Sequence, residues 1–294
     1  MRTRASGYRR PQPDMPLPAG RIDRWLAFSF GLAVAVLLAF IALPIVAIFV
    51  RVPPVTLLAQ LHSRVALDAL GVSLRASVTA LAVILVLGTP AAYVLATRPR
   101  RHSAILTTIL ELPLVLPPPV AGLGLLMAFG KQGLLGGPLR AVGVTLTFTR
   151  IAVVMALVFV SLPFFVRQAI ASFQALDPQL MAASRTLGAG PARTFFRVAL
   201  PLARPGLSAG AALAFARSLG EFGATLMFAG SLQGATQTLP IAVFTELAQG
   251  FDVALAIAAL LVAISAGLFV GVKLLLREAN PTWLETSSST SVTA

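Results

Sequence analysis

The sequence contains no cysteine and only two histidines, His62 and His102, among its 294 residues. The absence of cysteine excludes a disulfide framework, a thiol nucleophile and a cysteine-based metal site. Two isolated histidines, both between apolar runs, do not suggest a histidine-based metal centre. We therefore expect no metal, no cofactor and no catalytic residue in this chain.

Charge is also scarce. Only 11% of the residues are charged, against about 25% in an ordinary soluble domain, while 57% are hydrophobic and the mean hydropathy is +0.88. These values predict a polytopic membrane protein. The apolar runs are long and continuous rather than alternating, so the spans are helices and the fold class is all-α.

About six transmembrane helices are expected. The candidate spans are Trp25–Val50, Leu70–Ala96, Ile105–Phe129, Ala141–Ile170, Pro205–Ala229 and Phe251–Leu276. The third contains Pro113 and the run Pro117-Pro118-Pro119, and proline interrupts the helical hydrogen-bond ladder. Six full spans and five spans plus one broken segment both remain open.

The basic residues orient the chain. With the N-terminus in the cytoplasm, sixteen of the 23 lysines and arginines lie inside and four outside, as the positive-inside rule requires. Both termini are then cytoplasmic. The predicted organisation is a basic, disordered tail (1–24), a permease domain (25–276) with a cytoplasmic loop (172–204), and a short C-terminal tail (277–294). The net charge of +13 reflects these flanks and the lipid bilayer rather than nucleic acid.

The cytoplasmic loop contains a polar, arginine-bearing segment, Asp177–Pro201, which is longer than packing alone requires. Small residues at 182–184 favour a short helix, and Gly188 permits a turn after it. Phe195, Phe196 and Val198 provide the apolar face of a second short helix, which Leu200-Pro201 can end.

This spacing resembles the EAA loop of ABC importer permeases, which couples them to a cytoplasmic ATPase. The family's glutamate falls on Ala182, so that acid is missing here, and its two alanines fall on Ala183 and Ser184. The coupling residues that the resemblance implies are Ala182, Ala183, Ser184, Gly188, Val198, Leu200 and Pro201.

Three further stretches resemble permeases of the molybdate and sulfate importers: LPLVLPPPVAG (112–122), LAFARSLGEFGATLMFAG (213–230) and TQTLP (236–240). The resemblance covers about residues 70–275 and implies a type I ABC importer permease fold. It also implies a bacterial inner-membrane location, a homodimer, cytoplasmic ABC ATPase subunits and an extracytoplasmic oxyanion-binding protein. Molybdate is the expected substrate, with tungstate as a co-substrate and alternating access as the mechanism.

Charged residues within the spans have two readings. Arg217 and Glu221 are four residues apart on one helix face, so they either shape the anion path or gate, or form a structural ion pair. For Arg75 and Arg150, extension toward the headgroups is favoured over substrate contact. The glycine pairs 206/210 and 267/271 allow close packing, within one subunit or between two.

The sequence lacks a Walker A phosphate-binding pattern, so ATP hydrolysis is assigned to a separate subunit and the chain is not expected to be an enzyme. A sulfate or thiosulfate permease is the alternative within the same class. A secondary transporter would need coupling charges at mid-membrane and no ATPase dock, and a membrane-embedded enzyme would need clustered His, Asp or Glu, which the sequence does not have.

Overall fold

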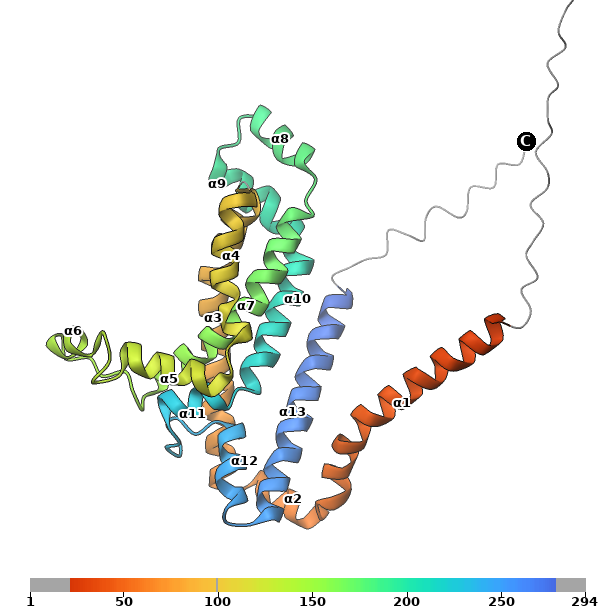
Figure 1. The fold of residues 1–294 in the computed structure, drawn as a ribbon, viewed down its shortest axis with the longest axis vertical. Coiled ribbons are helices and arrows are strands. Elements are labelled where there is room, and N and C mark those ends of the chain that lie inside the picture. Colours follow the sequence, from red (N-terminus) through yellow and green to blue (C-terminus); the bar gives the residue numbers. More distant parts are fainter. Residues whose placement is uncertain (1–21, 99, 279–294) are drawn as a thin grey trace, which may run out of the picture. The chain divides into compact units, whose positions relative to one another are not determined.

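The computed structural model describes residues 22–98 and 100–278, and every regular element in that part of the chain is a helix (Figure 1). The all-α class is therefore confirmed. The elements are α1 (Ile22–Arg51), α2 (Pro54–Leu61), α3 (Arg64–Thr97), α4 (Arg100–Val115), α5 (Pro118–Phe129), α6 (Gly136–Ala141), α7 (Arg150–Gln174), α8 (Pro178–Thr186), α9 (Pro191–Thr194), the π-helical turn η1 (Phe195–Ala199), α10 (Leu200–Leu219), α11 (Gly223–Ala229), α12 (Leu239–Leu247) and α13 (Phe251–Glu278).

The chain divides into two compact units at residue 51. The first contains α1, a single helix of 30 residues, which at 1.5 Å per residue is about 45 Å long and can cross a bilayer. The second unit begins at Val52 and contains the other helices. The predicted tails, 1–24 and 277–294, fall almost entirely outside the described residues, so the disorder expected of the first tail stays a prediction.

In the described part of the chain, five helices are long and apolar enough to cross a membrane, and a bent pair raises the number to six. The spans as they stand are Trp25–Arg51, Arg64–Thr97, Arg150–Gln174, Pro191–Leu219 and Phe251–Leu268, with the pair Ala104–Val115 and Pro118–Phe129 bent by 113°. The broken-segment alternative for the third predicted span is the correct one.

Proline causes this break. Pro118 and Pro119 have no amide hydrogen to continue the ladder of α4, so α4 ends at Val115 and a new helix begins at Pro118. The carbonyl of Pro117 accepts hydrogen bonds from the amides of Val120 and Ala121, at 2.9 and 3.1 Å, and so starts the ladder of α5.

Two other predicted spans were wrong in detail. The span expected at Ala141–Ile170 begins only at Arg150, because Thr149 caps α7 by accepting a hydrogen bond from the amide of Ala152 at 3.2 Å. The span expected at Pro205–Ala229 is broken between Leu219 and Gly223, so that α11 is a separate short helix.

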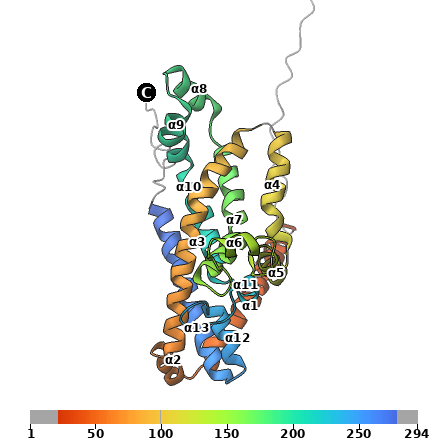
Figure 2. The ribbon, with the colours of Figure 1, turned by 90° about the vertical axis from the view of Figure 1, so that its left-hand side faces the viewer.

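The centre of the second unit is formed by α3, α7 and α10, which pack against one another (Figures 1 and 2). At one end of these helices lie α8 and α9, and at the other lie α2, α12 and the start of α13. The buried core is rich in alanine, including Ala76, Ala80, Ala156 and Ala214, so the helix backbones approach closely.

The first glycine pair belongs to this internal packing. A Cβ atom on Gly206 would collide with the side chain of Ser172 in α7, and one on Gly210 would lie 3.1 Å from Gln168. By contrast, a Cβ atom on Gly267 or Gly271 in α13 would meet nothing within 4 Å. The 206/210 pair therefore packs within the chain, while the 267/271 pair is open.

Candidate functional site

The first arm of the Asp177–Pro201 segment is the helix α8. Asp177 caps it, because its side chain accepts a hydrogen bond from the amide of Gln179 at 2.8 Å. Along the nine residues of α8, all of them described, no residue is buried. Ala182 and Ala183 are exposed and Ser184 is half-buried. A short helix with no buried residue presents an exposed surface to another molecule.

Gly188 ends α8 in a tight left-handed turn. Its φ angle is +78°, and the amides of Gly188 and Ala189 donate to the carbonyls of Arg185 and Ser184, both at 3.0 Å. This is the Schellman arrangement, in which the residue after the helix adopts the left-handed conformation that glycine favours. The turn predicted at Gly188 is confirmed.

The second arm begins with α9 and passes through the π-helical turn η1 directly into α10. The prediction that Leu200-Pro201 ends this arm was wrong, since helical backbone continues through both residues. The wider turn explains the difference: the amide of Leu200 donates to the carbonyl of Phe195, five residues earlier, so the ladder is already shifted where Pro201 lacks a donor. The second arm and the span α10 therefore form one helical body.

An aromatic cluster holds the second arm against two other spans. The ring of Phe195 lies 4.8 Å from that of Tyr93 in α3 and 6.3 Å from that of Phe173 in α7, centroid to centroid. Tyr93 and Phe173 are 5.3 Å apart in an edge-to-face arrangement. Val198, in the same π-helical turn as Phe195, is half-buried. The second arm therefore packs on α3 and α7 and is continuous with α10.

The two arms are joined by their hydroxyl groups. Ser184 in α8 and Thr194 in α9 lie 3.1 Å apart, oxygen to oxygen. Thr194 is only 1% exposed, so this contact satisfies a polar group that water cannot reach. The family resemblance gave Ser184 a place in the coupling loop, and the structure gives it this specific bond.

The outer face of the segment combines apolar and basic side chains. Leu187 at the turn is 86% exposed, Phe196 is 63% exposed and Leu180 is 47% exposed. The exposed arginines beside them are Arg185, Arg193 and Arg197. The sequence reading gave Phe195 and Phe196 one shared apolar face, but the structure turns Phe195 inward and Phe196 outward.

Arg217 and Glu221 form an ion pair at the break between α10 and α11. The guanidinium Nη2 lies 2.5 Å from Oε2 of Glu221, whose side chain is 1% exposed. The other carboxylate oxygen accepts a hydrogen bond from the amide of Ala224 at 2.9 Å. The carboxylate therefore joins the last turn of α10 to the first turn of α11 within one chain, and both of its oxygens are occupied.

The two short helices that follow the broken spans pack on each other. A Cβ atom on Gly122 in α5 would lie 2.6 Å from the carbonyl oxygen of Ala224 in α11, and one on Gly223 would lie 2.9 Å from the ring of Pro119. The stretches 112–122 and 213–230, singled out separately in the sequence, thus meet in space. Nothing in their spacing along the chain indicated this contact.

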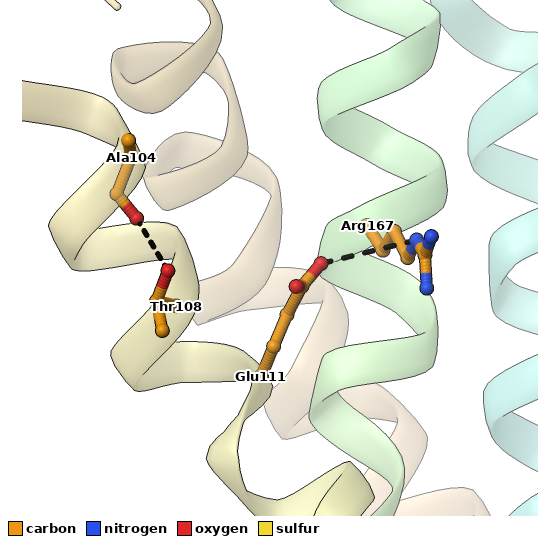
Figure 3. Close-up of polar contacts among 4 residues, drawn as sticks. All are labelled: Ala104, Thr108, Glu111 and Arg167. Atoms are coloured by element: carbon orange, nitrogen blue, oxygen red, sulfur yellow. Dashed lines mark hydrogen bonds and ion pairs between the residues drawn. The ribbon is translucent and has the colours of Figure 1, made fainter. Parts of the chain in front are cut away.

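A second charged pair was missed by the sequence reading. Glu111 in α4 points toward Arg167 in α7, with 3.9 Å between Oε1 and Nε (Figure 3). Arg167 lies within the span expected at Ala141–Ile170, although the charge count placed it on the cytoplasmic side, and α7 continues past Ile170 to Gln174. The pair borders a groove of about 480 Å³ between the two helices, lined also by Thr107, Thr108 and Gln174. The longer reach of α7 was not visible from hydropathy.

Arg75 and Arg150 were expected to extend toward lipid headgroups, and this stays a prediction. In the structure both side chains are exposed, and both line one open cavity of about 650 Å³ between α3, the start of α7 and the loop after α11. Among the described residues, no three His, Cys, Asp or Glu side chains are arranged so that they could hold a metal ion.

Comparison with known proteins adds a family and relatives. The model of the family described as "Binding-protein-dependent transport system inner membrane component" matches residues 84–275. The "Molybdenum transport system permease protein ModB" of Mycobacterium tuberculosis is 43% identical over 237 residues, which are 80% of this chain and 89% of that protein. A probable molybdenum ABC transporter permease of Haloferax volcanii is 38% identical over 83% of this chain and 88% of its own length.

Solved structures share the fold at low sequence identity. A chain of a bacterial alginate ABC transporter, solved with its periplasmic protein bound to an alginate pentasaccharide, superposes with a TM-score of 0.74 at 15% identity, covering 89% of this chain and 97% of that one. A chain of the MetNI methionine ABC transporter in an inward-facing conformation gives 0.58 at 19% identity, covering 74% and 97%.

Proposed function

This chain belongs to the family of binding-protein-dependent transport system inner membrane components, and we propose that it is the transmembrane permease subunit of an ATP-driven molybdate importer. The assignment of molybdate as the substrate rests on the 43% identity to a molybdenum transport permease along 89% of that protein's length. Tungstate, an oxyanion of the same shape and charge, is the expected co-substrate.

The energy source is proposed to be a separate cytoplasmic ATPase that docks on the Asp177–Pro201 segment. The exposed α8, the apolar side chains of Leu187 and Phe196, and the neighbouring arginines provide a surface of the kind that protein partners bind. ATP hydrolysis belongs to that partner. The chain itself supplies the path across the membrane.

Movement of the ATPase is proposed to open and close this path by alternating access. The second arm is continuous with α10, and Phe195 packs on Tyr93 and Phe173 of α3 and α7. A movement of the coupling segment is therefore passed to α3, α7 and α10 through packed side chains. Arg217 and Glu221 are proposed to shape the gate by fixing the bend between α10 and α11, rather than by binding the anion, because both carboxylate oxygens are occupied.

Two further parts of the assembly follow from the family. An extracytoplasmic oxyanion-binding protein is proposed to deliver the anion to the end of the bundle opposite α8, with both termini in the cytoplasm of a bacterial cell. A homodimer is proposed because one kind of permease subunit must provide two ATPase docks. The open glycines Gly267 and Gly271 allow a neighbouring helix to approach α13 closely.

Uptake in proteoliposomes tests this function. The permease is reconstituted with its ATPase and binding protein, and labelled molybdate uptake is measured with and without ATP and with an equal concentration of sulfate. We expect ATP-dependent uptake that sulfate does not abolish. Uptake that survives ATP depletion would indicate a secondary transporter, and abolition by equimolar sulfate would indicate a sulfate or thiosulfate permease.

A further inference from the structure

The cavity that contains Arg75 and Arg150 is formed by three segments distant in sequence. The helix α3 contributes Asp68, Arg75 and Thr79, the start of α7 contributes Arg150, and the loop between α11 and α12 contributes Gly234 and Ala235. The volume is about 650 Å³. At about 30 Å³ per water molecule, it holds roughly twenty waters, enough for a small anion with part of its hydration shell.

Three hydrogen bonds fix the loop and the first residue of α12, which follows it. Arg150 donates to the carbonyl of Gly234 at 3.0 Å, and Gln233 donates to Asp68 at 3.3 Å. The buried amide of Leu239 donates to the hydroxyl of Ser73 at 2.8 Å. The loop is therefore held against both α3 and α7, and Arg150 has part of its hydrogen-bonding capacity engaged with the loop.

Arg75 is the cation left for a ligand. Among the side chains that the structure describes, no carboxylate lies within ion-pair distance of its guanidinium, and that group forms no hydrogen bond with any of them. A cation held within a span usually faces a partner or a water-filled path, because an unpaired charge in lipid is costly. Here the side chain faces a cavity.

The charges facing the cavity leave it positive. Two guanidinium groups, those of Arg75 and Arg150, face one carboxylate, that of Asp68, which is two helical turns away from Arg75 along α3. Asp68 already accepts a hydrogen bond from Gln233. The remaining lining is mostly aliphatic, so these three side chains are its only charged groups.

The cavity lies next to the contact between the two broken spans. Ala76 and Val153 line it and also belong to the core cluster that contains Ala121 of α5 and Ala224 of α11. Arg75 is 22 residues from Thr97, where α3 ends near the coupling segment, which corresponds to roughly 33 Å along the helix. An anion in the cavity would therefore lie beside the α5–α11 contact and far from the ATPase dock.

We propose that the Arg75–Arg150 cavity is a binding site for a tetrahedral oxyanion dianion on its way into the membrane. Arg75 supplies the charge that attracts the anion, and Arg150 holds the loop that completes the site. This inference rests on the proposed function for the direction of transport and for the choice of molybdate. The positive cavity itself does not depend on which oxyanion is carried.

The cysteine-free sequence permits a direct test by thiol labelling. Thr79→Cys places one thiol in the cavity, and His62→Cys places one in the exposed turn before α3. The complete transporter is placed in nanodiscs, which expose both faces, and labelled with an anionic and a cationic thiosulfonate reagent. We expect the ratio of anionic to cationic labelling rates at Thr79→Cys to fall about tenfold when Arg75→Gln removes the positive charge. Arg75→Lys keeps that charge, so the ratio should stay the same. The ratio at His62→Cys should not change.

Protection by substrate identifies the ligand. Molybdate is expected to slow the labelling of Thr79→Cys but not of His62→Cys, and Arg75→Gln should remove this protection. Protection by sulfate but not molybdate would support the site while contradicting molybdate as the substrate. A labelling ratio at Thr79→Cys that Arg75→Gln does not alter, or a thiol that neither reagent reaches, would overturn the inference even if molybdate uptake is normal.

Discussion

Gly122 and Ala224 lie so close that a Cβ atom on Gly122 would be 2.6 Å from the carbonyl oxygen of Ala224 and 2.8 Å from its Cα. This contact joins α5 to α11, the two short helices that follow a break in a span. Both breaks have a local cause. One is the run of prolines at 117–119, and the other is the end of α10 at Gly220, after which the Glu221 carboxylate accepts a hydrogen bond from the amide of Ala224. The two breaks therefore form one structural unit.

The first prediction concerns this close approach. Gly122→Ala would place a methyl group against the backbone of Ala224, which has no freedom to rotate away, so we expect a loss of about 1–3 kcal/mol of stability and reduced uptake. Gly124→Ala on the same helix is the control, because its Cβ would meet nothing within 4 Å. Thermal unfolding of the detergent-solubilised protein should separate the two variants, and equal melting temperatures would contradict the α5–α11 contact.

Local features of this protein could be predicted from its sequence, and contacts between distant segments could not. Hydropathy located the spans, proline marked the break at 117–119, and Gly188 marked the turn of the coupling segment, because each effect acts within a few residues. The positions of Arg75 and Arg150 depended on how α3, α7 and the 230–238 loop pack. Hydropathy also misplaced the ends of α7, since Thr149 caps the helix well after the expected start at Ala141, and the helix continues past the expected end at Ile170 to Gln174.

The second prediction concerns the ion pair of Arg217 and Glu221. Glu221→Ala would leave a partly buried guanidinium without its partner and the first turn of α11 without its acceptor, so we expect a loss of about 3–5 kcal/mol. Glu221→Gln keeps an oxygen that can accept from the amide of Ala224 and should lose less. A double-mutant cycle with Arg217→Met, measured by thermal unfolding, gives the coupling energy. A coupling near zero would mean that the pair does not hold the bend.

The third prediction uses two adjacent phenylalanines with opposite environments. Phe195→Ala removes a ring that packs on Tyr93 and Phe173, so we expect lower thermal stability, by less than about 3 kcal/mol because the ring is only partly buried. Phe196→Ala removes a ring that is 63% exposed, so stability should hardly change, while ATPase binding should weaken. Melting temperatures and ATPase co-purification are measured on both variants. Normal ATPase binding by Phe196→Ala would exclude this ring from the dock.

The fourth prediction separates shape from charge in the coupling segment. Gly188 has a φ angle of +78°, where a β-branched residue is strained by at least about 1–2 kcal/mol, so Gly188→Val should distort the turn and uncouple ATP hydrolysis from uptake. Gly190→Ala is the matched control, since Gly190 has an ordinary φ of −67° and open space around it.

Ala182→Glu restores the acid of the related loops at an exposed position of α8, and we expect uptake to remain nearly unchanged if docking depends on the shape of the two arms. Uptake and binding-protein-stimulated ATP hydrolysis are measured together in proteoliposomes. The two activities should stay in proportion for Ala182→Glu and Gly190→Ala and should diverge for Gly188→Val. If Ala182→Glu instead changes coupling strongly while Gly188→Val does not, then ATPase binding depends on the charge at position 182. The left-handed turn is then not what aligns the two arms.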